Sequence, residues 1–357
     1  MHPAAKSQTC KALKDNVAGE IKLHHEPAKY IDMPIARQSV PEDQNYDDIS
    51  DSFELDRDQV KLVRLLGTGN FGQVSKGTYG TSRLNVAVKS LKDNAEQMDI
   101  RNMLSEADVM KSLQPHPHIV RLIGYCIERV PLLIVLEYLP YGDLLGYLRK
   151  SRGHEDTYNS GEKRPNSKLQ EKDLLSFAWM IADGMSYLAA MKVVHRDLAA
   201  RNVLVGENKV CKISDFGLAR SLKGDIYTRR SQARLPAKWM PPESLFSDES
   251  STMSDVWSYG IVMWEVFTIG ESPYPGIPAR QVANLLQTGY RMPRPRHLSE
   301  ELYAIMTECW EEQPQKRPTF QWLCFAVRRL LDDQKMYLDL DEYDDKEYVN
   351  FDMKIEE

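Results

Sequence analysis

The stretch HRDLAARN at residues 195–202, followed by DFG at 215–217, is the most informative part of this sequence. Asp197 is placed to accept the proton of an attacking hydroxyl group, or to orient that hydroxyl. Asn202 follows five residues later on the same loop, and Asp215 opens the second motif. Side-chain oxygens of Asp and Asn are ligands that hard cations such as Mg²⁺ prefer. The spacing therefore predicts a centre that places divalent cations beside a catalytic carboxylate.

A glycine-rich motif, LGTGNFGQV at 66–74, indicates a loop that approaches phosphate groups. Gly67, Gly69 and Gly72 let the backbone come close to phosphate oxygens and direct N–H groups at them. Dinucleotide-binding proteins use the same GxGxxG spacing, and a plain hairpin turn is a further alternative. A dinucleotide-binding loop opens a helix, whereas the strand-like run QVSKGTYG follows here. The loop is therefore predicted to be a hairpin lid, with Val74 packed on a flat base.

The run VAVK at 86–89 lies on the next strand pattern and ends at Lys89, which is placed to hold nucleotide phosphates. Glu106 lies 17 residues further along, within a run at 98–113 whose apolar residues have helical spacing. An ion pair between Lys89 and Glu106 would fix the ammonium group in place. The alternative is that Glu106 belongs to a solvated helix face.

In this order the motifs resemble the protein kinase superfamily across residues 55–332. The resemblance implies an α+β class and the bilobal protein kinase fold. The N-lobe, 53–139, is expected to be small and mostly β with one key helix, because KLVRLL, QVSKGTYG, NVAVKSLK and PLLIVLEYL read as strands. The C-lobe, 140–332, is expected to be larger and mostly α, with an amphipathic helix at 172–191 and a central buried helix at 254–268.

The segments around these lobes differ in composition. Residues 1–52 are predicted to be a flexible, juxtamembrane-like leader, 151–170 a polar insert and 333–357 an acidic, tyrosine-containing tail. The chain has a net charge of −6, and residues 332–357 alone hold 11 acidic and 3 basic residues, so the charge does not indicate a nucleic-acid partner. Five scattered cysteines without a CxxC pair predict neither a disulfide framework nor a zinc site, and they fit a reducing compartment. The sequence has no recognisable signal peptide, myristoylation pattern or spanning apolar run, which predicts a soluble chain.

The resemblance implies ATP and Mg²⁺ as cofactors and gives a role to each matching residue. Catalytic roles fall to Asp197, Lys89, Arg201 and Asn202, and metal ligation to Asn202 and Asp215. The residues implied to contact the nucleotide are Leu66, Gly67, Thr68, Gly69, Gly72, Val74, Ala87, Lys89, Glu106, Glu137, Leu139, Asp143, Arg201 and Asp215. Within this set, Glu137 and Leu139 stand where a hinge backbone binds adenine, beside Leu136 at the gatekeeper position.

Supporting positions are implied in the same way. The hydrophobic spine that aligns the two lobes is matched by Met110, His195 and Phe216. Glu243 and Arg317 stand where a buried ion pair anchors the activation segment. Asp255 stands where a helix residue holds the backbone of the HRD motif.

Two features resemble tyrosine kinases rather than serine/threonine kinases. Kinases selective for serine or threonine usually place Lys two residues after the catalytic Asp, and this chain has Ala199 there and Arg201 two residues later. LPAKWM at 235–240 resembles the tyrosine-kinase substrate platform, in which Pro236 and Trp239 shape a broad apolar shelf. An atypical serine/threonine kinase is the alternative.

Tyr227 lies in the segment between the DFG and Pro-Glu motifs, where phosphorylation would pair it with Arg196 or Arg220 and order the loop. The alternative is a plain exposed tyrosine. The sequence departs from the family pattern in two ways: Pro241 replaces the alanine of the APE motif, and the segment has a single tyrosine. The single tyrosine argues against stepwise activation at several sites.

The chain is most similar in appearance to receptor tyrosine kinases of the fibroblast growth factor receptor class, on HRDLAARNVLV, the polar insert and YLDL at 337–340. The resemblance implies the intracellular part of a plasma-membrane receptor, with tyrosine-containing substrates and a trans-autophosphorylating dimer. Tyr30 in YIDM, Tyr337 in YLDL and Tyr348 in YVNF resemble docking sites for phosphotyrosine-reading adaptors and lipid-signalling enzymes. A solubilising acidic tail is the alternative for the last two.

Two other functions stay open at this point. A non-receptor, cytoplasmic tyrosine kinase is one alternative to the receptor type, because the sequence as given shows no span or ectodomain. A pseudokinase scaffold is the other alternative, although pseudokinases usually lose the counterparts of Lys89, Asp197 or Asp215, and all three are present.

Overall fold

The computed structural model describes residues 53–68, 72–92, 95–153, 168–221, 227–228, 236–333 and 335–348. All of them belong to one unit, Gln44–Glu357. The leader with Tyr30, the glycine-loop residue Gly69 and most of the polar insert lie outside the described residues, so the predictions made for them stay predictions.

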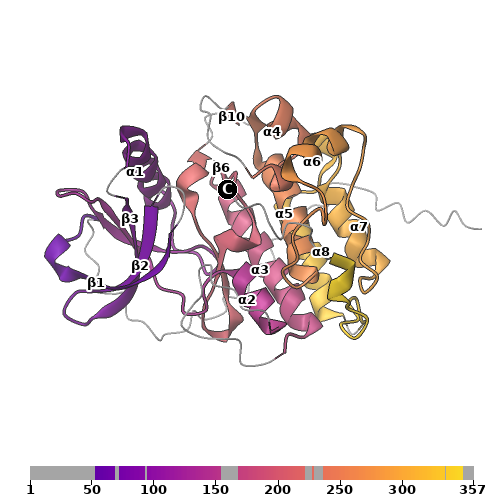
Figure 1. The fold of residues 1–357 in the computed structure, drawn as a ribbon, viewed down its shortest axis with the longest axis horizontal. Helices are drawn as coiled ribbons and strands as arrows, with labels where there is room; N and C mark the ends of the chain where they lie inside the picture. The colour runs from indigo at the N-terminus through magenta and orange to yellow at the C-terminus, as the bar shows by residue number, and fades with distance from the viewer. Residues whose placement is uncertain are drawn as a thin grey trace, which may run out of the picture. The chain divides into compact units, whose positions relative to one another are not determined.

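The N-lobe is built on a five-stranded antiparallel sheet (Figure 1, indigo to purple). Its strand order is β1-β2-β3-β5-β4. The strands are β1 (Val60–Thr68), β2 (Gly72–Tyr79), β3 (Leu84–Leu91), β4 (Leu122–Cys126) and β5 (Leu133–Glu137). Four of the five match predicted strands, and β4 is an addition that the sequence pattern did not predict.

The side chains of β3 alternate between the two faces of the sheet, and this alternation decides on which face Lys89 lies. Val86 and Val88 are fully buried in a cluster with Ile123 and Val135. Side chains of a strand alternate between its two faces, so Ala87 and Lys89 face the opposite way. The helix α1 (Gln97–Lys111) packs its buried side chains into the core on that other side. The period-two pattern therefore turns Lys89 toward the helix that bears Glu106.

The C-lobe is mostly helical, as predicted (Figure 1, magenta to yellow). Its helices are α2 (Leu144–Ser151), α3 (Glu171–Ala190), α4 (Pro242–Phe246), α5 (Thr252–Phe267), α6 (Ala279–Gln287), α7 (Glu300–Cys309) and α8 (Phe320–Asp332). Every residue from Ser254 to Phe267 is buried, because α5 is apolar nearly all round and packs against both α3 and α7. The predicted α+β, bilobal kinase fold is confirmed.

Short elements connect these helices around the catalytic loop. Three antiparallel pairs are formed by β6 (Val193–Val194) with β9 (Arg220–Ser221), β7 (Val203–Val205) with β8 (Cys211–Ile213), and β10 (Tyr227–Thr228) with β11 (Glu249–Ser250). The 3₁₀ turns are η1 (Arg57–Gln59), η2 (Ala200–Asn202), η3 (Glu207–Lys209), η4 (Phe216–Leu218), η5 (Ala237–Trp239), η6 (Pro314–Lys316) and η7 (Asp345–Tyr348).

The described part of the acidic tail, residues 335–348, packs on the C-lobe. Tyr337 is 3% exposed and Tyr348 6%, and both belong to the hydrophobic core. The backbone N–H groups of Tyr337 and Leu338 donate to Glu171 Oε1 at 2.5 and 3.0 Å. Tyr348 meets the Trp264 ring edge-on at 5.8 Å. Packed structure thus continues beyond residue 332, because tyrosines and a leucine interrupt the acidic run.

Two absences hold for the part of the chain that the structure describes. None of its helices combines the length and the apolarity that crossing a membrane requires. Its four described cysteines, Cys126, Cys211, Cys309 and Cys324, are all free.

Candidate active site

The ammonium group of Lys89 pairs with one carboxylate from each lobe. This group lies 2.6 Å from Glu106 Oε2 and 3.0 Å from Asp215 Oδ1, so the predicted ion pair with Glu106 is present. Burial alone would lower the pKa of Lys89, but the carboxylates of Asp215 and Glu106 outweigh burial and raise it. The same ammonium group holds the pKa of Asp215 below its usual range. The centre therefore carries a fixed positive charge beside an ionised carboxylate.

Asp255 of α5 fixes the backbone of the HRD loop through hydrogen bonds. Its carboxylate accepts the backbone N–H groups of His195 and Arg196 at 2.8 and 2.9 Å. Arg196 has φ of 71°, a left-handed conformation that a non-glycine residue keeps only when its surroundings enforce it. The buried carboxylate supplies that enforcement, as the resemblance implied.

Asn202 ties the same loop to the DFG segment. Its side-chain amide nitrogen donates to the carbonyl oxygen of Asp197 at 2.6 Å. The backbone carbonyl oxygen of Asn202 accepts both the N–H and the hydroxyl of Ser214, at 2.8 and 2.9 Å. The residue before Asp215 is thereby fixed relative to the loop that carries Asp197.

The Asp197 carboxylate is paired with Arg201, whose Nη2 lies 2.6 Å from Oδ1. Burial raises the pKa of Asp197 and the charge on Asp215 adds to that rise, whereas Arg201 opposes it. The Arg201 guanidinium also stacks on the Trp239 ring, 4.3 Å from its centroid. Arg201 is therefore held by the catalytic carboxylate and by the predicted substrate platform at once.

Sequence reasoning missed Glu265, which connects these groups from below. It is 1% exposed, and its Oε2 accepts the N–H of Ala200 and the indole N–H of Trp239, both at 2.9 Å. Burial raises its pKa. A glutamate within the mostly apolar run at 254–268 was the available signal, because a buried carboxylate in such a helix needs hydrogen-bond partners.

The three spine positions are all inside the core. Met110 is 4% exposed, and His195 and Phe216 are fully buried. The rings of His195 and Phe216 meet edge-to-face at 5.4 Å. His195 Nε2 donates to the carbonyl of Ser214 at 2.9 Å, which fixes the ring. Helix α1 packs on the turn η4 that bears Phe216, so the position of Glu106 is coupled to that of the DFG motif.

The predicted hinge residues have structural partners of their own. The Glu137 carboxylate accepts from Lys212 Nζ at 2.8 Å and from the Arg121 N–H at 2.7 Å. Asp143 caps α2 by accepting the Gly146 N–H at 2.8 Å. The Glu137 carboxylate is thus already engaged within the protein, and the contact of its backbone with a nucleotide stays a prediction.

Strands β1 to β3 bring the remaining predicted nucleotide-contact residues together. Gly67 pairs with Val74 across the β1–β2 hairpin, and Ala87 is 7% exposed on β3. A Cβ atom on Gly72 would lie 2.3 Å from the Ser90 carbonyl oxygen. Gly72 is therefore required by the β2–β3 packing, in addition to any role toward phosphate.

The end of the activation segment is anchored as the resemblance implied. Arg317 binds both Glu243 carboxylate oxygens, at 2.6 and 2.9 Å, and its side chain is fully buried. Pro241 caps α4 and Pro242 occupies its first turn, a position that suits proline. Tyr227 pairs with Ser250 in the β10–β11 ladder, and the structure describes only its backbone.

Fold and site together define a protein kinase: a sheet lobe with a lysine–glutamate pair, and a helical lobe with Asp197 on its HRD loop. Residues 60–327 match the family of protein tyrosine and serine/threonine kinases, and the chain belongs to that family. The chain is 42% identical over 308 residues to the tyrosine kinase receptor Cad96Ca of Drosophila melanogaster. That match covers 84% of this chain and 39% of the relative, so the chain spans well under half of that receptor's length.

Proposed function

We propose that this chain is an ATP-dependent protein tyrosine kinase that transfers the γ-phosphoryl group of ATP to tyrosine hydroxyls. The observation that carries the proposal is the position of Lys89 between Glu106 and Asp215, with Asp197 on the neighbouring loop. Phosphoryl transfer needs little covalent chemistry from the protein, so positioning and charge stabilisation account for most of catalysis. The ordered charges around Lys89 fit that requirement.

The donor set of this centre fits Mg²⁺ and a nucleotide. Asp215 is an ionised carboxylate. The side-chain amide nitrogen of Asn202 donates to the Asp197 carbonyl oxygen, which leaves the side-chain amide oxygen to ligate a metal ion. These two residues would hold the metal, which when bound neutralises charge on the phosphates. Lys89 would bind the α- and β-phosphates. The base and sugar would lie against Leu66, Thr68, Val74, Ala87, Leu139 and Asp143, with the glycine loop over the phosphates.

Asp197 is the proposed base that receives the tyrosine hydroxyl proton at a carboxylate oxygen. Its raised pKa favours proton acceptance, and Arg201 fixes its orientation. Ala199 is fully buried, so that position contributes no cation to the site. The guanidinium of Arg201 and the face of Trp239 instead form one surface beside Asp197, which suits a phenol ring. This arrangement supports tyrosine over serine as the acceptor.

We further propose that the chain is the intracellular part of a receptor that acts at the plasma membrane. The similarity to a tyrosine kinase receptor supports this, and HRDLAARNVLV with YLDL supports the fibroblast growth factor receptor class. Substrates would be tyrosines on signalling proteins and on a second copy of the chain, including Tyr227. Tyr30, Tyr337 and Tyr348 would recruit adaptors and lipid-signalling enzymes. The burial of Tyr337 and Tyr348 implies that the tail must leave the C-lobe first.

The acceptor assay tests this proposal. The full chain is incubated with Mg-ATP and an equimolar pair of peptides that differ only in carrying tyrosine or serine. We expect label on the tyrosine peptide, loss of that label with Asp197→Asn, and retention with Asp108→Asn, an exposed residue of α1. Preferential labelling of serine, or full activity of Asp197→Asn, would contradict the proposal.

A further inference from the structure

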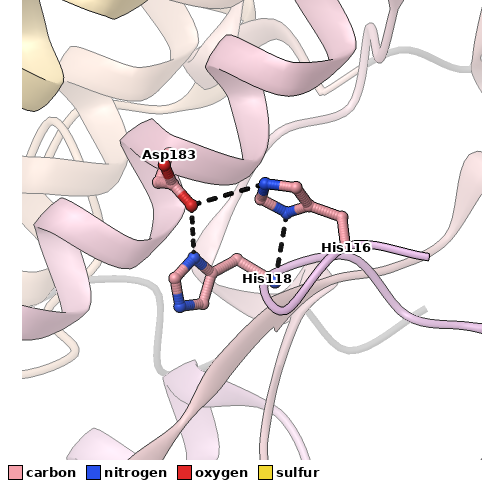
Figure 2. A group of neighbouring side chains, drawn as sticks. All are labelled: His116, His118 and Asp183. Carbon is pink, nitrogen blue, oxygen red and sulfur yellow. Dashed lines mark hydrogen bonds and ion pairs between the residues drawn. The ribbon is translucent and has the colours of Figure 1, made fainter. Parts of the chain in front are cut away.

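Three side chains outside the catalytic motifs converge on one place. His116 and His118 lie on the loop between α1 and β4, and Asp183 lies on α3. Figure 2 shows both imidazole rings directed at one carboxylate. His118 Nδ1 is 2.7 Å and His116 Nε2 is 3.5 Å from the same atom, Asp183 Oδ2. One ligand atom from each residue lies within 4.8 Å of the others.

We propose that His116, His118 and Asp183 form a binding site for a zinc-class divalent ion, with a water molecule as the fourth ligand. Two imidazole nitrogens and one carboxylate oxygen are a donor set that zinc accepts when it keeps an open position. Zinc bonds of 2.0–2.1 Å in a tetrahedron hold neighbouring ligand atoms roughly 3.3 Å apart. The His116–Asp183 separation is already near that value, and the His118–Asp183 separation must open by roughly 0.6 Å.

Hydrogen bonding alone explains only part of this geometry. A ring N–H donated to Asp183 accounts for His118 at 2.7 Å. The 3.5 Å separation at His116 is too long for a good hydrogen bond, although the ring is directed at the carboxylate. A cation between the groups would account for the separation at His116.

Neighbouring aromatic rings hold the two histidines in place before any ion arrives. Tyr187 stacks on His116 with 4.7 Å between centroids, and its hydroxyl donates to the Gln114 carbonyl at 3.0 Å. Trp179 meets His118 edge-on at 5.4 Å. Ligands that are already oriented lose less conformational entropy on binding. The His116 and Asp183 side chains are 17% and 28% exposed, so an ion and its water can reach them from solvent.

Ion binding requires a proton to move within each ring. His116 Nδ1 accepts the His118 N–H at 3.2 Å, so the neutral ring carries its proton on Nε2, facing Asp183. Coordination through Nε2 transfers that proton to Nδ1 and ends the long amide contact. His118 binds through Nδ1, so the proton that Nδ1 donates to Asp183 moves to Nε2. No net proton is released from neutral rings.

The site would join two parts of the fold that carry the active site. His116 and His118 follow α1, the helix of Glu106, and Asp183 belongs to α3 of the C-lobe. An ion bound only in the folded state stabilises it by mass action. Loading should therefore raise the thermal midpoint of the chain without contacting the catalytic residues.

Cobalt(II) reports this geometry directly and tests the proposal. The full chain, stripped with a chelator, is titrated with Co²⁺ while visible absorption is recorded, and its thermal midpoint is measured with and without Zn²⁺. We expect tetrahedral-type bands that saturate at one ion per chain, without the intense near-ultraviolet bands of thiolate ligation. Zn²⁺ should raise the midpoint. Asp183→Asn and His116→Gln should each weaken both responses by more than about tenfold in ion concentration.

The adjacent pair His24 and His25 supplies the matched control. Replacing both with Gln should leave the bands and the midpoint shift intact. Bands that persist in Asp183→Asn, or that vanish with the His24 and His25 replacements, would overturn the site. A wild-type chain without bands or Zn²⁺ response, whose Asp183→Asn variant is merely less stable, would show a hydrogen-bonded cluster and would also overturn it.

Discussion

Replacing Arg317 with methionine should destabilise the C-lobe and disconnect the activation segment from it. The Arg317 side chain is fully buried and donates to both Glu243 oxygens, to the Met253 carbonyl at 2.8 Å and to the Glu311 carbonyl at 2.9 Å. Its guanidinium also lies 5.0 Å from the centroid of the Trp257 ring. Methionine fills much of the same volume but satisfies none of these acceptors.

The expected magnitude follows from the charge left behind. Removing one partner of a buried ion pair costs about 3–5 kcal/mol, because the remaining charge is uncompensated. At roughly 2 °C per kcal/mol for a domain of this size, Tm should fall by roughly 6–10 °C. Glu243 lies in the first turn of α4 at the end of the activation segment, so kinase activity should also fall at temperatures where the variant is still folded.

Thermal unfolding followed by circular dichroism measures this effect beside a matched control. Arg328→Met removes the exposed Arg328–Asp332 pair on α8, whose side chains are 45% and 60% exposed, and should shift Tm by no more than about 2 °C. Adding Glu243→Gln to Arg317→Met should recover part of the loss, because it removes the stranded charge. Equal shifts for Arg317→Met and Arg328→Met would refute the reasoning.

Three further predictions concern the site and the tail. Lys89→Met should lower kcat by about 10²–10³-fold, by analogy with the loss of one group that stabilises developing charge, and initial rates with Mg-ATP measure this. The raised pKa of Asp197 means that kcat/KM should fall on the acid side at a pH above the ordinary Asp value of 3.8, since the base must be ionised; a limb at or below 3.8 would contradict it. Tyr348→Ala should cost about 3 kcal/mol in urea unfolding and Tyr348→Phe much less, because phenylalanine keeps the ring that packs on Trp264; equal costs would argue against that packing.

The chemistry of the site was predictable where it depends on spacing along the chain. Lys89 and Glu106 could be paired because strand alternation and helical spacing each have a short period. Asp197, Asn202 and Asp215 could be grouped because they lie on two short motifs, HRDLAARN and DFG. Glu265 was not recognised, because its role depends on Trp239 and Ala200, which meet it only through tertiary packing.

Features decided by packing were beyond the sequence pattern. Strand β4 is five residues long and contains Gly124, which weakens a strand pattern. The structure shows why glycine stands there: a Cβ atom would lie 2.5 Å from both Leu55 and the Phe53 carbonyl oxygen. The prediction of a separate tail rested on its charge, whereas the buried side chains of Tyr337 and Tyr348 determine where it packs. Sequence patterns indicate how side chains alternate within one helix or strand. They do not indicate which other element packs over its buried face.

The most direct test of the central claim is single-turnover phosphoryl transfer from Mg-ATP to a tyrosine peptide, comparing the full chain with its Asp197→Asn variant. A positioned general base contributes typically 10²–10⁴-fold, so the rate constant should fall by about that factor while nucleotide affinity stays unchanged. A variant that transfers phosphate as fast as the unaltered chain would contradict the assignment of Asp197 and the catalytic account built on it.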